Sequence, residues 1–208
     1  MTMLLSIFLL FYVSETNNGK VGISVSPQTH PLLIINSFDA QSMNARKNKK
    51  ALFSELADSL KTMLKLEFER KQNREVIIVP GLINNSEGKD SVYIELINKY
   101  SATQAVVIKN LNAYFEQTGV EVTKESDGKK RVASYDINAD VTYLLYNNAG
   151  IMRKTDTKVF EFFTERSVAS GLLAAGPDIV GKSKHAFKIV QKNAEQYLRE
   201  IKFDLVGE

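Results

Sequence analysis

Apolar positions follow two different patterns along the chain, and the first half shows short apolar blocks between helical repeats. Residues 32–35, 76–79 and 105–108 are wholly apolar, which predicts three strands buried on both faces. Apolar residues recur at spacings of three and four from 50 to 70, and a shorter repeat runs from 90 to 100. That spacing predicts two helices, so the first half is expected to run β-α-β-α-β.

The second half opens with strict alternation. Every odd position from Ala133 to Leu145 is apolar, which predicts a long antiparallel strand with one face in water. A polar turn at 147–150 predicts that residues 151–163 return as the hairpin partner. Helical spacing from 186 to 201 predicts a closing helix. The expected fold class is α/β (α+β), with a mixed sheet in β-α-β-α-β order followed by a long antiparallel hairpin and a C-terminal helix.

The chain begins with an apolar segment at residues 3–13. As a helix it would be about 16 Å long, too short for a hydrocarbon core of about 30 Å but of the length found in signal peptides. The preceding residues carry no positive charge, so a retained anchor, a buried strand or a misplaced start are alternatives. We expect a signal-like segment at 1–15, a polar linker at 16–30 and one domain at 31–205.

Composition narrows the classes of function. The 208 residues include no cysteine, which excludes disulfides, thiolate nucleophiles and a lipid-attachment cysteine. A net charge of +3 from 27 basic and 24 acidic residues is too balanced for a protein that binds nucleic acid through its charge. The expected location is the cell envelope, periplasmic or membrane-associated through residues 3–13, or the cytoplasm if that segment is not a signal.

Three patterns in the sequence resemble parts of known chemical sites, and none predicts a catalytic, cofactor-binding or metal site. The segment from Gly81 to Lys89 has too many residues between its glycines for a phosphate-binding loop. Asp136, Asn138 and Asp140 resemble the start of a calcium loop, but its later glycine and acidic ligand are missing. His185 has no acidic neighbour in sequence, so it is expected to be a surface histidine.

Two groups of residues are candidate contacts. Four basic residues precede or begin the first long helix and are a possible anion site: Arg46, Lys47, Lys49 and Lys50. The segment 170–181 combines three glycines with four large aliphatic residues, which predicts a partner contact or a loop folded onto the sheet. Its aliphatic residues are Leu172, Leu173, Ile179 and Val180.

Three stretches of the chain resemble small α/β domains of the bacterial envelope. These stretches are the helix end and strand at 98–110, the strand and turn at 141–151 and the last helix at 186–201. They look like the corresponding segments of the TolB amino-terminal domain and the curli-secretion lipoprotein. They are similar also to the lipoprotein activators of penicillin-binding proteins and to an uncharacterised family of Gram-negative envelope lipoproteins. The resemblance implies a binding or scaffolding role and brings no catalytic residue with it.

The expected function is therefore that of a non-enzymatic envelope protein, which binds another envelope protein or an envelope polymer and uses no cofactor. Two alternatives stay open. One is a hydrolase whose site is assembled around His185, and the other is a subunit of an oligomeric envelope secretion assembly. The sequence does not identify the partner or the oligomeric state.

Overall fold

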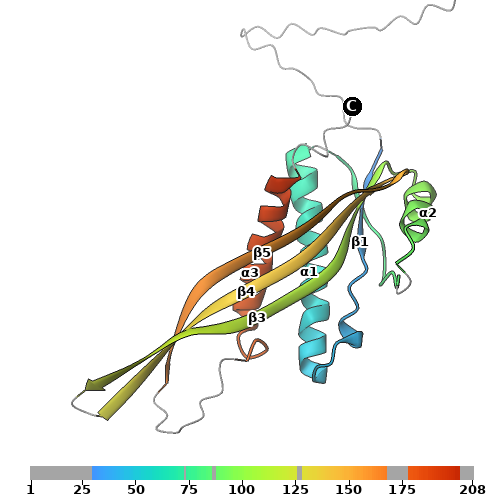
Figure 1. Cartoon of the computed structure of the whole chain (residues 1–208). Helices are drawn as coiled ribbons and strands as arrows, with labels where there is room; N and C mark the ends of the chain where they lie inside the picture. Colours follow the sequence, from blue (N-terminus) through green and yellow to red (C-terminus); the bar gives the residue numbers. More distant parts are fainter. Residues whose placement is uncertain (1–29, 73, 86–87, 126–127, 168–177, 202–208) are drawn as a thin grey trace, which may run out of the picture.

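The computed structural model describes residues 30–72, 74–85, 88–125, 128–167 and 178–201. Figure 1 shows a long, twisted sheet with helices packed against it. The elements in chain order are β1 (Leu32–Asn36), a 3-10 turn η1 (Ala40–Ser42), α1 (Lys47–Gln72), β2 (Val76–Ile78), α2 (Ser91–Lys99), β3 (Gln104–Glu125), β4 (Gly128–Asn147), β5 (Gly150–Ser167) and α3 (Ser183–Glu200).

The sheet is mixed, with strand order β2-β1-β3-β4-β5. β1 lies parallel to both β2 and β3, because the α1 and α2 segments carry the chain back across the sheet between them. β3, β4 and β5 follow as a continuous antiparallel meander. This arrangement confirms the predicted fold class.

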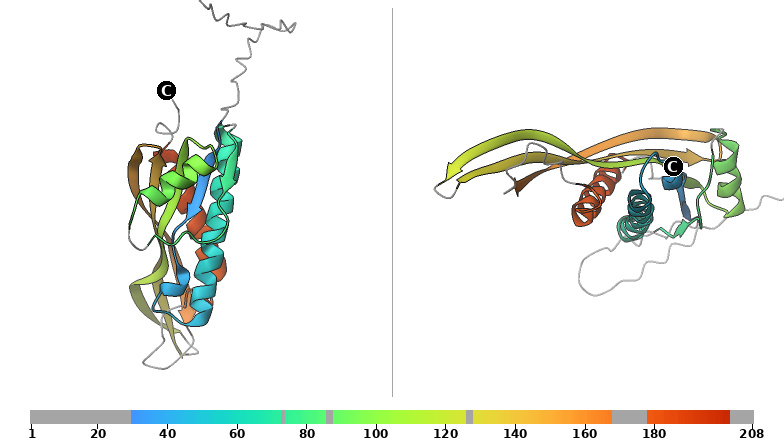
Figure 2. Two further views of the ribbon diagram at one scale, coloured as in Figure 1. Left: turned by 90° about the vertical axis from the view of Figure 1, so that its right-hand side faces the viewer. Right: turned by 90° about the horizontal axis from the view of Figure 1, so that it is seen from below.

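Helices cover the two faces of the sheet unequally. α1 and α3 run beside each other on one face, as Figure 2 shows, and bury the larger apolar core. The odd positions of β4 from Ala133 to Leu145 are buried, as the alternation predicted, and those from Ile137 onward belong to this core. α2 packs on the opposite face at one end only, against residues such as Leu33, Val107 and Tyr146. Much of that second face is therefore left without a helix.

The β3–β4 hairpin is longer than the hydrophobic pattern indicated. The apolar block of the third predicted strand covers 105–108 and the alternation of the next strand begins at Ala133, whereas the ladder between them continues to the pair Glu125 and Gly128. The extension projects past the ends of α1 and α3 (Figure 1). Because no helix covers it there, its residues need no buried apolar repeat, and backbone pairing alone defines the strands.

A buried polar cluster joins α3 to the sheet. Asn193 is fully buried, and its Oδ1 accepts hydrogen bonds from the Tyr143 hydroxyl (3.0 Å) and the Thr157 hydroxyl (2.6 Å). Its Nδ2 donates to the backbone oxygens of Ala139 (3.0 Å) and Thr157 (3.1 Å). Burial raises the pKa of the Tyr143 hydroxyl well above its ordinary value, so the hydroxyl stays a donor. The cluster fixes α3 over β4 and β5.

One local expectation needs correction. Asn138 was expected on the wet face of its strand, but only 2% of it is exposed, because β4 is a central strand and side chains of β3 and β5 flank it. Asp90 occupies the cap position of α2 without making a capping hydrogen bond. Its carboxylate instead accepts a hydrogen bond from the Tyr146 hydroxyl at 2.8 Å.

Candidate functional site

The predicted basic residues lie around the start of α1. Arg46 and Lys49 line a hollow of about 300 Å³ together with Asn44, Ala45, Asn48, Asp178 and Val180. Lys49 also places its ammonium 5.7 Å from the centre of the Phe53 ring. Lys50 turns away and donates to the backbone oxygen of Gln41. The fold thus joins part of the predicted basic group, Arg46 and Lys49, to Val180 of the predicted partner contact.

The charges of this hollow are mixed. No acidic residue stands in the first turn of α1, which favours an anion there. Asp178 nevertheless lines the same hollow, and its carboxylate accepts a hydrogen bond from the Val180 amide (3.1 Å). The Asn48 side chain accepts from the Lys49 amide (2.9 Å), so one of the amides at the helix start is already occupied. Anion binding by Arg46, Lys47, Lys49 and Lys50 stays a prediction.

The predicted apolar contact is only partly within the described residues. Ile179 is 5% exposed and belongs to the larger core, and the half-buried Val180 packs against that core. Both side chains thus pack within the domain. For these two residues, this agrees with the alternative expectation of a loop folded onto the sheet. Leu172 and Leu173 lie outside the described residues, so their role as a contact surface stays a prediction.

The described residues offer little for catalysis. The His185 ring packs edge-on against Phe163, with ring centres 4.8 Å apart, and within the described part of the chain no side chain hydrogen-bonds to it. That same part contains no group of three or more histidine, aspartate and glutamate residues able to hold a metal ion. Asp136, Asn138 and Asp140 lie in line along β4, as expected for residues of a sheet strand. The hydrolase hypothesis gains no support from this geometry.

A different surface stands out, on the face of the sheet that α2 leaves uncovered. Phe160 and Phe162 of β5 are 65% and 63% exposed, the two highest values among the exposed large apolar side chains of the described residues. Tyr114 and Asn138 lie in the same cross-strand row as Phe160, and Glu116 and Asp136 in the row of Phe162. We call this set, together with Lys158 and Asp140 of the next row, the open-face patch.

Charged groups border the aromatic part of the open-face patch. Lys158 pairs in register with Asp140, and its ammonium donates a hydrogen bond to the Tyr114 hydroxyl (3.4 Å). This hydrogen bond is the main cause of a raised pKa of Lys158, and the charge of Asp140 adds to it. Asp140 Oδ1 is buried, and none of the described residues hydrogen-bonds to it. The open-face patch therefore combines exposed rings with one cation and several carboxylates.

The sequence contained a signal for these residues that the pattern analysis missed. Residues 160–163 read Phe-Glu-Phe-Phe, so aromatic residues occupy both the even and the odd positions of one strand. Successive side chains of a strand point to opposite faces. Phe163 turns toward α3 and contacts His185, which leaves Phe160 and Phe162 to the other face. Phenylalanines at both even and odd positions of this strand were therefore a sign that the rings on one face are exposed.

Comparisons with known proteins identify no family. No protein-family model matches the sequence, and no curated protein matches it. Solved structures with a similar course of the chain include a minor lipoprotein from Acinetobacter baumannii, with 10% identity over 82% of this chain and 91% of that chain at a TM-score of 0.42. A putative neuraminyllactose-binding hemagglutinin homolog from Helicobacter pylori has 12% identity over 85% of this chain and 84% of that chain, at a TM-score of 0.45. The rare lipoprotein B from Shewanella oneidensis has 10% identity over 83% of this chain and 92% of that chain, at a TM-score of 0.33. At these identities and scores we take no function from them.

Proposed function

We propose that this chain is a non-enzymatic binding protein of the bacterial cell envelope, which holds another envelope protein on the open-face patch. The observation that carries the proposal is the exposure of Phe160 and Phe162 side by side on the part of the sheet face that α2 leaves uncovered. Large aromatic side chains exposed together are typical of binding surfaces, because their burial by a partner removes much apolar area from water.

The free energy available from burying the two rings is large enough for a specific interaction. Full burial of a phenylalanine side chain contributes about 1.5–3 kcal/mol. Phe160 and Phe162 together therefore supply enough apolar energy for a small interface centre, although ordering costs take part of it. Asp136, Glu116 and Lys158 surround the rings, and a polar rim around an apolar centre is typical of contacts between proteins. The carboxylates make an anionic lipid surface a poor alternative.

The envelope location in this proposal rests on the apolar segment at residues 3–13. None of the helices in the described part of the chain is long and apolar enough to cross a membrane. We expect the full-length protein to fractionate with the envelope and a variant lacking residues 1–15 to stay in the cytoplasm. Equal cytoplasmic recovery of the two forms would refute the location.

Binding is tested by replacing both exposed rings. Phe160→Ser with Phe162→Ser should abolish cross-linking to envelope proteins from a photo-reactive residue placed at Thr164, the next exposed position of β5. Leu66→Ser is the matched control, because Leu66 is 59% exposed but lies on α1, away from the patch. Both variants should keep the wild-type melting temperature. Unchanged cross-linking in the double variant would refute the proposed surface.

A further inference from the structure

β5 is an unprotected edge of the sheet. Within the described residues it pairs with β4 only, so one row of its backbone amides and carbonyls has no strand beside it. It is 18 residues long, contains no proline, and keeps an uninterrupted register with β4 from Arg153 to Ser167. Natural proteins usually shorten such edges, interrupt them or place charged residues on them, because a long regular edge is a template for another strand. This edge therefore has the geometry of a pairing surface.

The charges of β5 are arranged for pairing with itself. In an antiparallel pair of two identical strands centred on Thr157, residue Asp156 of each copy faces Lys158 of the other. By symmetry this contact forms twice. Asp156 and Lys158 both point to the exposed face of the sheet, where their charges are accessible to a second copy. Directly opposed charges of opposite sign stabilise a strand pair, whereas like charges destabilise it.

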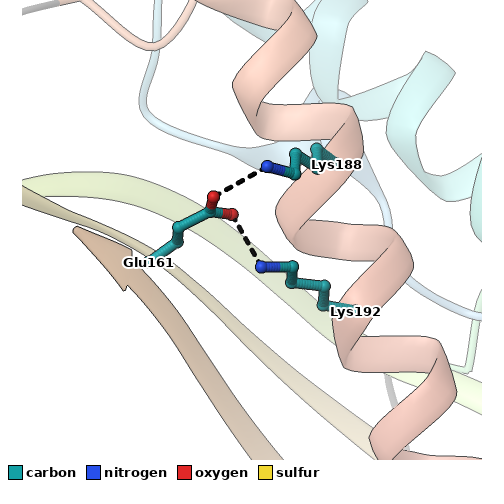
Figure 3. A network of polar contacts seen from close by, with 3 residues as sticks. All are labelled: Glu161, Lys188 and Lys192. Carbon is teal, nitrogen blue, oxygen red and sulfur yellow. Dashed lines mark hydrogen bonds and ion pairs between the residues drawn. The ribbon is translucent and has the colours of Figure 1, made fainter. Parts of the chain in front are cut away.

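The next pairs in this register are also favourable. Lys154 faces Phe160, so that its aliphatic stem and ammonium lie against an exposed ring. On the helix face Arg153 comes opposite Glu161, again with opposite charges. Glu161 already forms ion pairs with Lys188 (2.7 Å) and Lys192 (2.9 Å) of α3 and is turned toward that helix (Figure 3). We therefore assign most of the specificity to Asp156 and Lys158.

Neighbouring registers are less favourable. Moving the centre by one residue places Asp156 opposite itself or Lys158 opposite itself. A centre at Thr155 also sets opposite charges against each other, Asp156 against Lys154, but it leaves Phe160 facing Gly150, beyond the irregularity of the ladder between Leu145 and Tyr146. A centre at Glu161 would bring Phe160 opposite Phe162, but it sets the two Glu161 side chains against each other. The charges thus disfavour centres at Asp156, Lys158 and Glu161, and the position of Phe160 favours Thr157 over Thr155.

We propose that two copies of this chain pair antiparallel through β5, about a twofold axis at Thr157, into one continuous sheet. In this dimer Phe160 and Lys158 of the open-face patch contact the second copy along the strand edge, while the face of the patch stays accessible and is doubled across the axis. The inference goes beyond the proposed function, because a second copy occupies the strand edge and the envelope partner occupies the face. Either one can fail while the other holds.

A charge exchange tests the pairing. Light scattering after size-exclusion chromatography, on the full-length chain in mild detergent, should give twice the protein mass of 23.3 kDa. Asp156→Lys and Lys158→Asp should each raise the dissociation constant at least about tenfold, because each creates two like-charge contacts. The combined variant Asp156→Lys with Lys158→Asp should dimerise again. Asp156 also pairs with Lys154 (3.0 Å) and Thr142 (2.6 Å) in its own chain, so the melting temperature of each variant is measured in parallel.

Cross-linking tests the register. The chain has no cysteine of its own, so single cysteines can be introduced without removing others. A short bismaleimide should join Lys154→Cys to Phe160→Cys when the two proteins are mixed, and should join neither to itself. In the proposed register, two copies of residue 154 lie about 20 Å apart at 3.3 Å per residue. Monomeric wild-type protein, failure of the combined charge variant to dimerise, or cross-linking only between residues 160 and 162 would each overturn the inference. Binding of an envelope protein by a monomer would leave the proposed function intact.

Discussion

Asn193 offers the sharpest test of how the helix layer is held on the sheet. Its side chain is fully buried and takes part in four hydrogen bonds, two as acceptor and two as donor. Asn193→Leu keeps the branching of the side chain, although leucine is larger than asparagine, and it removes all four hydrogen bonds. The substitution therefore tests mainly the polar contribution of this position, with some overpacking added.

The cost follows from the groups that lose their partners. The Tyr143 hydroxyl is buried and donates to Asn193, so the substitution leaves it unsatisfied. The Thr157 hydroxyl retains a second acceptor, the Val141 backbone oxygen at 3.2 Å. A buried polar group without a partner costs about 1–3 kcal/mol. With Tyr143 as the main loss, and smaller losses at Thr157 and the two carbonyls, we expect a decrease of about 2–4 kcal/mol in the free energy of unfolding.

Urea unfolding followed by circular dichroism measures this loss. Gln196→Leu is the matched control on the same helix, because Gln196 is half-buried and donates a hydrogen bond to Glu200 one turn away (2.9 Å). It should cost less than about 0.5 kcal/mol. Adding Tyr143→Phe to Asn193→Leu removes the unsatisfied hydroxyl and should recover about 1 kcal/mol. An Asn193→Leu variant as stable as Gln196→Leu would show that the cluster does not hold α3 in place.

Further predictions concern the sheet and the surface of α1. Ile137→Asp should cost several kcal/mol, because Ile137 is 1% exposed in the larger core. Asn138→Asp should cost about 1–2 kcal/mol, since it places a charge in a site only 2% exposed, between Asp136 and Asp140; thermal melts of both variants check this. Hydrogen bonds from Arg70 and Lys71 lower the pKa of Glu67 to about 2. This ion-paired carboxylate therefore adds stability above pH 4.5 that is lost as the pH falls toward 2. Because the pair lies at the surface, Glu67→Gln should cost under about 1 kcal/mol at pH 7, and the difference should vanish near pH 2 in urea titrations.

The core of the fold could be predicted because burial leaves a direct trace in the sequence. Residues such as Leu33 and Val107 lie between α2 on one face and α1 with α3 on the other, so the strands that carry them read as apolar blocks. The hairpin beyond Phe115 leaves no such trace, since backbone hydrogen bonds hold it and no helix covers it. Its length could not be read from hydrophobicity.

The candidate surface was harder to predict, because its residues have ordinary identities and only their placement is unusual. Phe160 and Phe162 belong to a strand that was expected as a hairpin partner, and the pattern did not say which face the helices would take. The basic group before α1 was visible as a cluster, but its neighbour Asp178 comes from a distant segment. Contacts of that kind depend on tertiary packing, which one-dimensional spacing does not encode.

The exposure of Phe160 and Phe162 follows from the register of β5, which the buried polar cluster around Asn193 helps to fix. Moving the strand by one residue would turn Phe160 and Phe162 toward the core and expose Val159 and Phe163 instead. That change would also turn Thr157 away from Asn193, with which it forms two of the four hydrogen bonds of the buried cluster. The cluster thus keeps α3 on the face of Thr157 and Phe163, and it holds the two other rings in solvent. An arrangement that forgoes the burial of two phenylalanines within the domain leaves them available to a partner, which is why we place the binding surface there.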